Sequence, residues 1–103
     1  MAQPTEAQRL AFAKGLAWLL LRHVKDLTPK GRKLIEAVRD AKTMDEMRAA
    51  AAAYTICTSA SASASAAFAA AFAYVAAYAQ KYAVKAGVPE HEVAALRMII
   101  FGE

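Results

Sequence analysis

The sequence is poor in the residues that crosslink small extracellular domains. Cys57 is its single cysteine, so the chain cannot form an internal disulfide, as is typical of proteins in a reducing compartment. The first residues do not combine a cationic segment, an apolar run and a cleavage site, so we expect no signal peptide. These absences predict a cytoplasmic protein, and 103 residues are enough for one domain with its own core.

Charged residues are missing from the middle of the chain. No Asp, Glu, Lys or Arg lies between Arg48 and Lys81. This uncharged stretch is longer than the roughly 20 residues that a bilayer span requires. The stretch is mostly Ala and Ser, however, and it nearly lacks the Leu and Ile that favour insertion. We therefore expect no membrane span. We expect instead a helix that is shielded by other polypeptide, either of this chain or of a companion.

Residues suited to catalysis or metal binding are also scarce. His23 and His91 are the only histidines, and neither has carboxylates or cysteines at the spacing of a metal site. Cys57 has no charged residue close to it in sequence that would favour a reactive thiolate. We therefore predict a protein that is not an enzyme and that uses neither a metal nor another cofactor.

Helix-start signals are the clearest local patterns that the sequence contains. Capping boxes begin at Thr5 and Thr43, and Thr28 is an N-cap residue followed by a proline. Gly87 is suited to end a helix. The expected helices cover residues 5–26, 29–41, 44–86 and 89–101. The predicted fold class is all-α, a small bundle of four helices in one domain over residues 1–103.

The third expected helix is unusually long, because no Gly or Pro interrupts residues 44–86. As one straight helix it would measure about 64 Å at 1.5 Å per residue. Its weakest part is residues 55–65, where Ser and Thr side chains compete for backbone hydrogen bonds. A kink or short break near Thr58 is therefore the alternative to a continuous helix.

Large side chains recur at heptad spacing along this expected helix. One column of positions seven residues apart begins at Tyr54 and ends at Tyr82, which is typical of a helix that packs against a partner helix. A second column of positions and flanking aromatic residues widen this column into a stripe along one side of the expected helix. The predicted protein interface comprises Tyr54, Phe68, Phe72, Val75, Tyr78 and Tyr82.

Basic residues are in mild excess, with a net charge of +4. Lys30, Arg32 and Lys33 follow the N-cap Thr28, where the free N–H groups of a helix start can hold an anion. The segment lacks the preceding strand and the glycine spacing of a phosphate loop. We expect a solvated turn, with weak contact to a nucleic-acid backbone as the alternative.

Three short segments carry a resemblance to known proteins. They read RLAF at residues 9–12 with WLL at 18–20, TMDEMRAAA at 43–51, and AALRMIIFG at 94–102. In this order they resemble a loose group of alanine-rich helical proteins from bacteria and phages, some of which are described as immunity proteins. The resemblance implies a protein-binding role, such as neutralising a toxin, and no catalytic motif. The chain departs from the group where Ser-Ala alternation replaces Ala-Arg or Ala-Asp.

Two functions remain open at this point. The first is a helical module that occupies a partner protein, as immunity and phage counter-defence proteins do. The alternative is a self-assembling coat or filament subunit of a virion, with weak nucleic-acid contact through the basic turn. A homo-oligomer that buries the alanine-rich helix is compatible with both. We favour the binding module.

Overall fold

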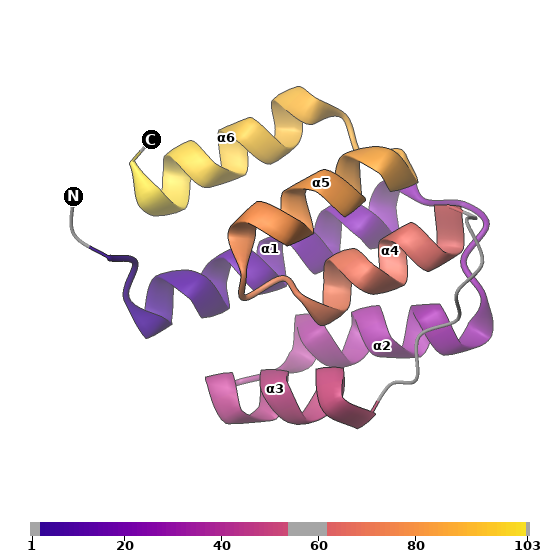
Figure 1. The fold of residues 1–103 in the computed structure, drawn as a ribbon, viewed down its shortest axis with the longest axis horizontal. Coiled ribbons are helices and arrows are strands. Elements are labelled where there is room, and N and C mark those ends of the chain that lie inside the picture. Colours follow the sequence, from indigo (N-terminus) through magenta and orange to yellow (C-terminus); the bar gives the residue numbers. More distant parts are fainter. Residues whose placement is uncertain (1–2, 54–61, 103) are drawn as a thin grey trace.

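The protein folds into six helices over residues 3–53 and 62–102, the part of the chain that the computed structural model describes (Figure 1). They are α1 (Glu6–His23), α2 (Pro29–Asp40), α3 (Met44–Ala53), α4 (Ala62–Ala71), α5 (Ala76–Ala86) and α6 (Glu90–Phe101). These two ranges contain no β-strand. The prediction of an all-α fold is confirmed.

The first three helices begin where their capping residues predict. Thr5 and Gln8 form a complete capping box at the start of α1. The hydroxyl of Thr28 accepts the Gly31 N–H at 3.0 Å at the start of α2, and Thr43 caps α3 in the same way. These side chains satisfy N–H groups that have no partner inside the helix. The start of each helix is therefore fixed by residues within one turn of it.

The single helix predicted over residues 44–86 is wrong, and so is the count of four helices. The described parts of this range, residues 44–53 and 62–86, contain three helices, and the chain reverses between Ala71 at the end of α4 and Ala76 at the start of α5 (Figure 1). The longest dimension of the molecule is 36 Å, whereas the continuous helix would measure about 64 Å. The alternative break near Thr58 lies outside the described residues.

Helix α4 packs against α1, α2, α3 and α5. Its buried residues are Ser63, Ala64, Ser65, Ala66, Ala67, Ala69, Ala70 and Ala71. The Ser63 hydroxyl donates a hydrogen bond to the backbone carbonyl of Asp26. This part of the uncharged stretch is thus shielded by the chain itself and requires no companion. None of the described helices combines the length and the apolar character needed to cross a membrane.

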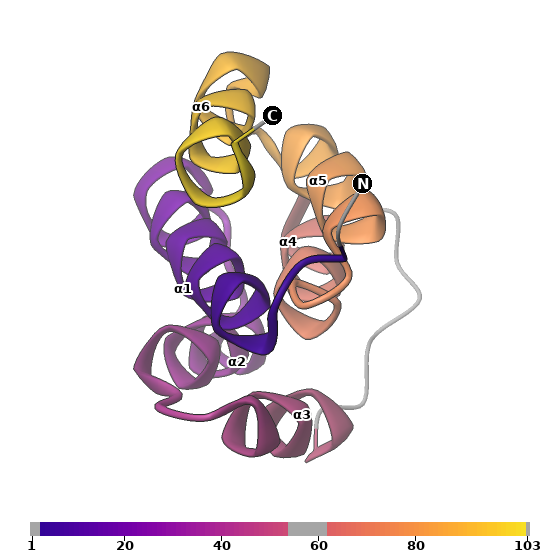
Figure 2. The ribbon, with the colours of Figure 1, turned by 90° about the vertical axis from the view of Figure 1, so that its left-hand side faces the viewer.

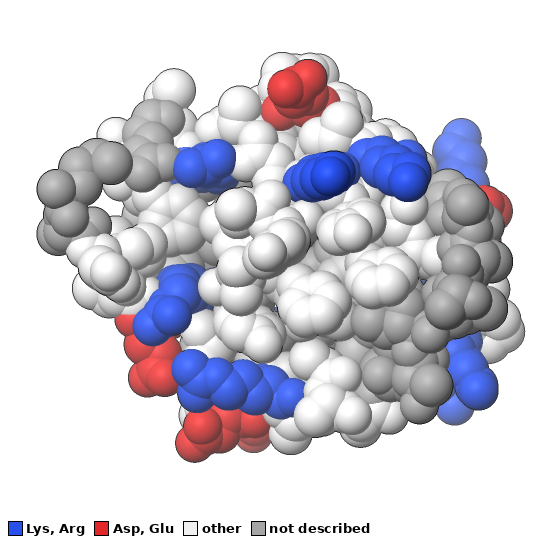
Figure 3. Space-filling model, in the orientation of Figure 1, with Lys and Arg blue, Asp and Glu red and all other residues white. Residues whose placement is uncertain are grey.

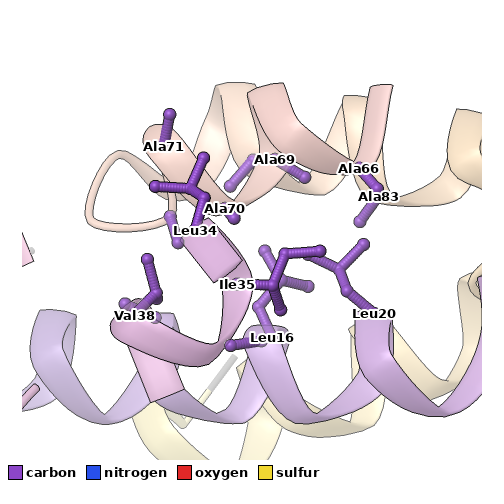
Figure 4. Packing of buried hydrophobic residues seen from close by; sticks show 14 of the residues in the cluster. Leu16, Leu20, Leu34, Ile35, Val38, Ala66, Ala69, Ala70, Ala71 and Ala83 are labelled. Carbon is purple, nitrogen blue, oxygen red and sulfur yellow. The ribbon is translucent and has the colours of Figure 1, made fainter. Parts of the chain in front are cut away.

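The core pairs large side chains on one side with alanines on the other. Leu16, Leu20 and Ile35 of α1 and α2 are fully buried, and they point toward the alanines of α4 and α5 (Figure 4). Small side chains allow helices to approach closely and keep the interior densely packed. Folding back α5 onto α4 therefore buries alanine faces that a straight helix would leave in water, and tertiary packing overrides the local helix propensity.

Helix α6 lies along α1, on the side opposite to α2 (Figure 2). The two helices are in close contact at Gly15, where an added Cβ would come within 2.7 Å of Leu96 Cδ1. At the end of α1, His23 Nε2 lies 2.5 Å from Glu92 Oε2 of α6. The turn into α6 passes through Gly87, whose φ of 120° disfavours any residue with a side chain. The predicted role of Gly87 as a helix end is thus confirmed.

Candidate functional site

A groove lined mainly by aromatic side chains opens where α4 and α5 meet. Its volume is about 360 Å³. It is formed by Phe68 of α4, by Tyr78 and Tyr82 of α5, and by Phe72, Tyr74 and Val75 of the reversal between them. All the described residues that line the groove therefore come from one continuous segment of the chain, residues 68–82.

The spacing of the aromatic residues explains why they converge. Phe68 and Phe72 are four residues apart, as are Tyr78 and Tyr82, so each pair lies on one face of the chain. Because the chain reverses, the rings of Phe68 and Tyr82 stack across the hairpin with centroids 5.2 Å apart. Phe68 also stacks on Phe72, with centroids 6.3 Å apart and an interplanar angle of 14°.

The two faces of α5 differ in exposure. Ala79 and Ala83 are fully buried against the bundle, whereas Tyr78 is 62% exposed. Phe72, at the reversal, is 37% exposed. Aromatic surface that remains in water costs free energy, and large exposed rings around a concave site are typical of binding surfaces. The groove is thus the opposite face of the same hairpin whose alanines complete the core.

The charged residues within and next to the groove segment in the sequence are positive. No Asp or Glu occurs from residue 47 to residue 89, and α5 carries the exposed lysines Lys81 and Lys85. Figure 3 shows the face over α4 and α5 with uncharged side chains at its centre, Lys and Arg bordering them, and Asp and Glu farther out at the upper and lower margins. At one edge of α5, Arg97 of α6 donates from Nη1 to Gln80 Oε1 at 2.6 Å. The nearest charges along the chain are therefore cationic.

The structure brings together five of the six residues predicted as a protein interface. Phe68, Phe72, Val75, Tyr78 and Tyr82 all line the groove. The sixth, Tyr54, lies outside the described residues. The heptad pattern therefore grouped residues that do lie together, although they meet across a hairpin and not along one straight helix.

Tyr74 also lines the groove and was not among the predicted interface residues. In the sequence it flanks the heptad column, as one of the aromatic residues that widen the stripe. The aromatic cluster from residue 68 to residue 82 was the one sequence signal that could have included it.

The predicted anion contact does not join this groove. Lys30, Arg32 and Lys33 are exposed on the first turn of α2, while the Gly31 N–H is already donated to Thr28. Gly31 lies near the backbone of Ser63, at the opposite end of α4 from Phe72. The basic turn is thus a solvated helix start beside the far end of the hairpin.

The histidines lie apart from the groove as well. His23 pairs with Glu92 between α1 and α6, and His91 is exposed on the first turn of α6. Within residues 3–53 and 62–102, no three His, Cys, Asp or Glu side chains are grouped as metal ligands would be. The aromatic groove is therefore the feature of the described chain that most resembles a binding site.

Comparisons of the chain with models of known protein families, with curated proteins and with solved structures give no match.

Proposed function

We propose that the protein is a non-enzymatic helical module that binds another protein through the groove formed by residues 68–82. The observation that supports this proposal is the concentration of partly exposed aromatic side chains around one concave site, with Tyr78 62% exposed at its edge. Aromatic residues, and tyrosine in particular, are enriched where proteins bind one another. The groove volume of about 360 Å³ falls in the range of sites that accept side chains or small ligands.

The burial of α4 changes the reason for expecting a partner. The uncharged length of the chain does not by itself require a partner, because α4 is covered by its own bundle. The aromatic groove is the surface that supports one. The resemblance to alanine-rich immunity proteins supports a narrower form of the proposal, in which the protein occupies a toxin or a defence protein in the cytoplasm.

Self-assembly as a structural subunit is the second candidate, and a specific observation favours it. Trp18 on α1 and Met98 and Ile99 on α6 are 65%, 62% and 81% exposed. Assembly into a filament requires two different surfaces on one subunit. These side chains would be the second surface, and the aromatic groove the first.

Site-specific photocrosslinking in the native host tests both candidates. A photoreactive phenylalanine analogue at position 78 should give one discrete adduct with another protein. The matched control carries the same analogue at Ala37, an exposed position on α2, and should not give this adduct. Phe72→Asp should abolish the adduct from position 78 because it places a charge in the groove.

Three outcomes would count against the binding module. Position 78 could give no adduct, or the same mixture of adducts as position 37. A third outcome, adducts only between copies of this chain, would favour the structural subunit instead.

A further inference from the structure

We infer that the segment bound in the groove is an acidic amphipathic helix of a partner protein. The inference depends on the proposed function, since it specifies the chemistry of the partner for the same groove. Its apolar side chains would contact the rings of Phe68, Phe72 and Tyr78, and its carboxylates would face Lys81 and Lys85.

Charge complementarity is the first argument. Lys81 and Lys85 lie on α5, on either side of the groove residue Tyr82 in sequence, and both are exposed. No Asp or Glu lies in residues 47–89. Lys and Arg border the uncharged centre of this face, while the Asp and Glu in view lie farther out, toward its upper and lower margins (Figure 3). A positive margin around an apolar site attracts negative partners and repels positive ones.

The shape of the site favours a helix. The groove lies at the reversal that joins two packed helices. Its rings occur four residues apart from Phe68 at the end of α4 to Phe72 in the reversal, and again from Tyr78 to Tyr82 on α5. Residues four apart on a helix are separated by about 5–6 Å. An incoming helix with apolar residues at i, i+3 or i+4, and i+7 presents the same spacing, as in other helix-in-groove complexes.

A second copy of this chain fits the groove less well. Each copy has a net charge of +4. The exposed apolar residue Trp18 lies between the cations Lys14 and Arg22, at one turn of α1 in either direction. A groove with a lysine margin would repel that surface.

Single-stranded nucleic acid also fits less well, although aromatic rings and lysines can bind it. Nonspecific nucleic-acid binding depends on several phosphate contacts and on rings that are free to stack on bases. The Phe68 ring stacks on both Phe72 and Tyr82. The groove segment itself carries only Lys81, and Lys85 follows it.

A charge-swap experiment with defined peptides tests the inference. The probes are two fluorescein-labelled helical peptides of about 18 residues, roughly 27 Å long, with the same leucines at i, i+4 and i+7. One has Glu at its polar positions and the other has Lys. Fluorescence anisotropy is measured at about 0.01 M and about 0.1 M salt, where the screening length is roughly 30 Å and roughly 10 Å.

The wild-type protein should bind the acidic peptide at least about tenfold more tightly than the basic peptide at the lower salt. The double variant Lys81→Glu/Lys85→Glu should lower the affinity for the acidic peptide by about tenfold, so that the basic peptide becomes the tighter ligand. The control Lys30→Glu/Lys33→Glu lowers the net charge by the same amount at the start of α2 and should change both affinities by about twofold or less. Tyr78→Ala should weaken binding by about tenfold, since a central aromatic contact is lost.

Equal affinity for the two peptides, or no change on charge reversal at Lys81 and Lys85, would overturn the inference. So would displacement of the acidic peptide by an oligothymidylate of about 20 nucleotides, which would assign the groove to nucleic acid. If any of these contrary results appears while position 78 still crosslinks to another protein, the proposal of a binding module stands and only the inference of an acidic partner helix is wrong. If no crosslink forms either, both proposals fail.

Discussion

Phe68 of α4 stacks on Tyr82 of α5 with ring centroids 5.2 Å apart and an interplanar angle of 23°. The two residues are separated by a reversal of the chain, so their contact forms only when the hairpin closes. Alanines of the same two helices complete the core on the other side. The stack therefore couples the stability of the hairpin to the shape of the groove.

A double-mutant cycle on Phe68→Ala and Tyr82→Ala should measure this coupling. Stacked aromatic pairs contribute about 0.5–1.5 kcal/mol beyond the free energy of burying their surface. The sum of the losses of unfolding free energy in the two single mutants should therefore exceed the loss in the double mutant by about that amount. The measurement is urea unfolding followed by circular dichroism. A control cycle pairs Phe68→Ala with Trp18→Ala, an exposed ring on α1, and should give additive losses. Additivity in the Phe68 and Tyr82 cycle would contradict the stack.

The alanines beneath the hairpin should not tolerate larger side chains. Ala69 is fully buried at the centre of the bundle, so Ala69→Leu should lower the free energy of unfolding by about 1–3 kcal/mol through overpacking. Ala77→Leu introduces the same side chain at an exposed position of α5 and should have little effect. The unfolding midpoint of each variant in urea decides the comparison. A stable Ala69→Leu variant would mean that α4 is not packed as closely as described.

Helix starts were predictable from the sequence because the interactions that determine them are local. Thr5, Thr28 and Thr43 each accept an N–H from the residue three positions later, and such pairs can be recognised without knowledge of the rest of the fold. Gly87 is also a local signal, because a helix end with a positive φ favours glycine. These signals placed the starts of α1, α2 and α3 and the end of α5.

The reversal between α4 and α5 was not predictable in the same way. Phe72 to Val75 contain neither Gly nor Pro, and Val75 adopts φ −109° and ψ 90°, which any residue can reach. The turn forms because it allows α5 to pack on α4, which is a property of the whole chain. Heptad spacing nevertheless brought Phe68 and Tyr82 into one predicted interface. Their contact across the hairpin could not be inferred, because residues fourteen apart on a helix lie about 21 Å from each other.

The carboxyl of Asp40 should respond to acid in a defined direction. Hydrogen bonds from the Arg39 guanidinium, at 2.9 Å to Oδ1 and 3.2 Å to Oδ2, hold the pKa of Asp40 below its ordinary value of 3.8. The stabilisation is fully present above the pKa of the unfolded chain, and it is lost as the pH falls through the lower pKa of the folded state.

An NMR titration of the Asp40 side chain should therefore give a midpoint below 3.8 in the folded protein. Arg39→Gln should raise the midpoint because it removes the hydrogen bonds and the charge. Arg32→Gln, which removes an exposed cation from the same helix, should leave it unchanged. A wild-type midpoint at or above 3.8 would show that the ion pair does not form in solution.

The contact between α1 and α6 should depend on the absence of a side chain at Gly15. An added Cβ would lie 2.7 Å from Leu96 Cδ1 and 3.1 Å from its Cδ2. A single methyl group can be accommodated if the end of Leu96 rotates, and Gly→Ala also favours the helix by about 1 kcal/mol, so Ala is a poor probe. Gly15→Val adds two further methyl groups that Leu96 cannot avoid. It should lower the free energy of unfolding by about 1–3 kcal/mol.

The matched control is Ala11→Val, one turn earlier on α1 at an exposed position, which should cost only the small helix propensity difference. Leu96→Ala in the Gly15→Val background should recover part of the loss, because it removes the atoms that the new side chain meets. Such recovery separates a steric effect between the helices from an effect within α1. If Leu96→Ala instead adds its full cost to that of Gly15→Val, the two residues are not in contact and α6 does not pack on α1 at Gly15.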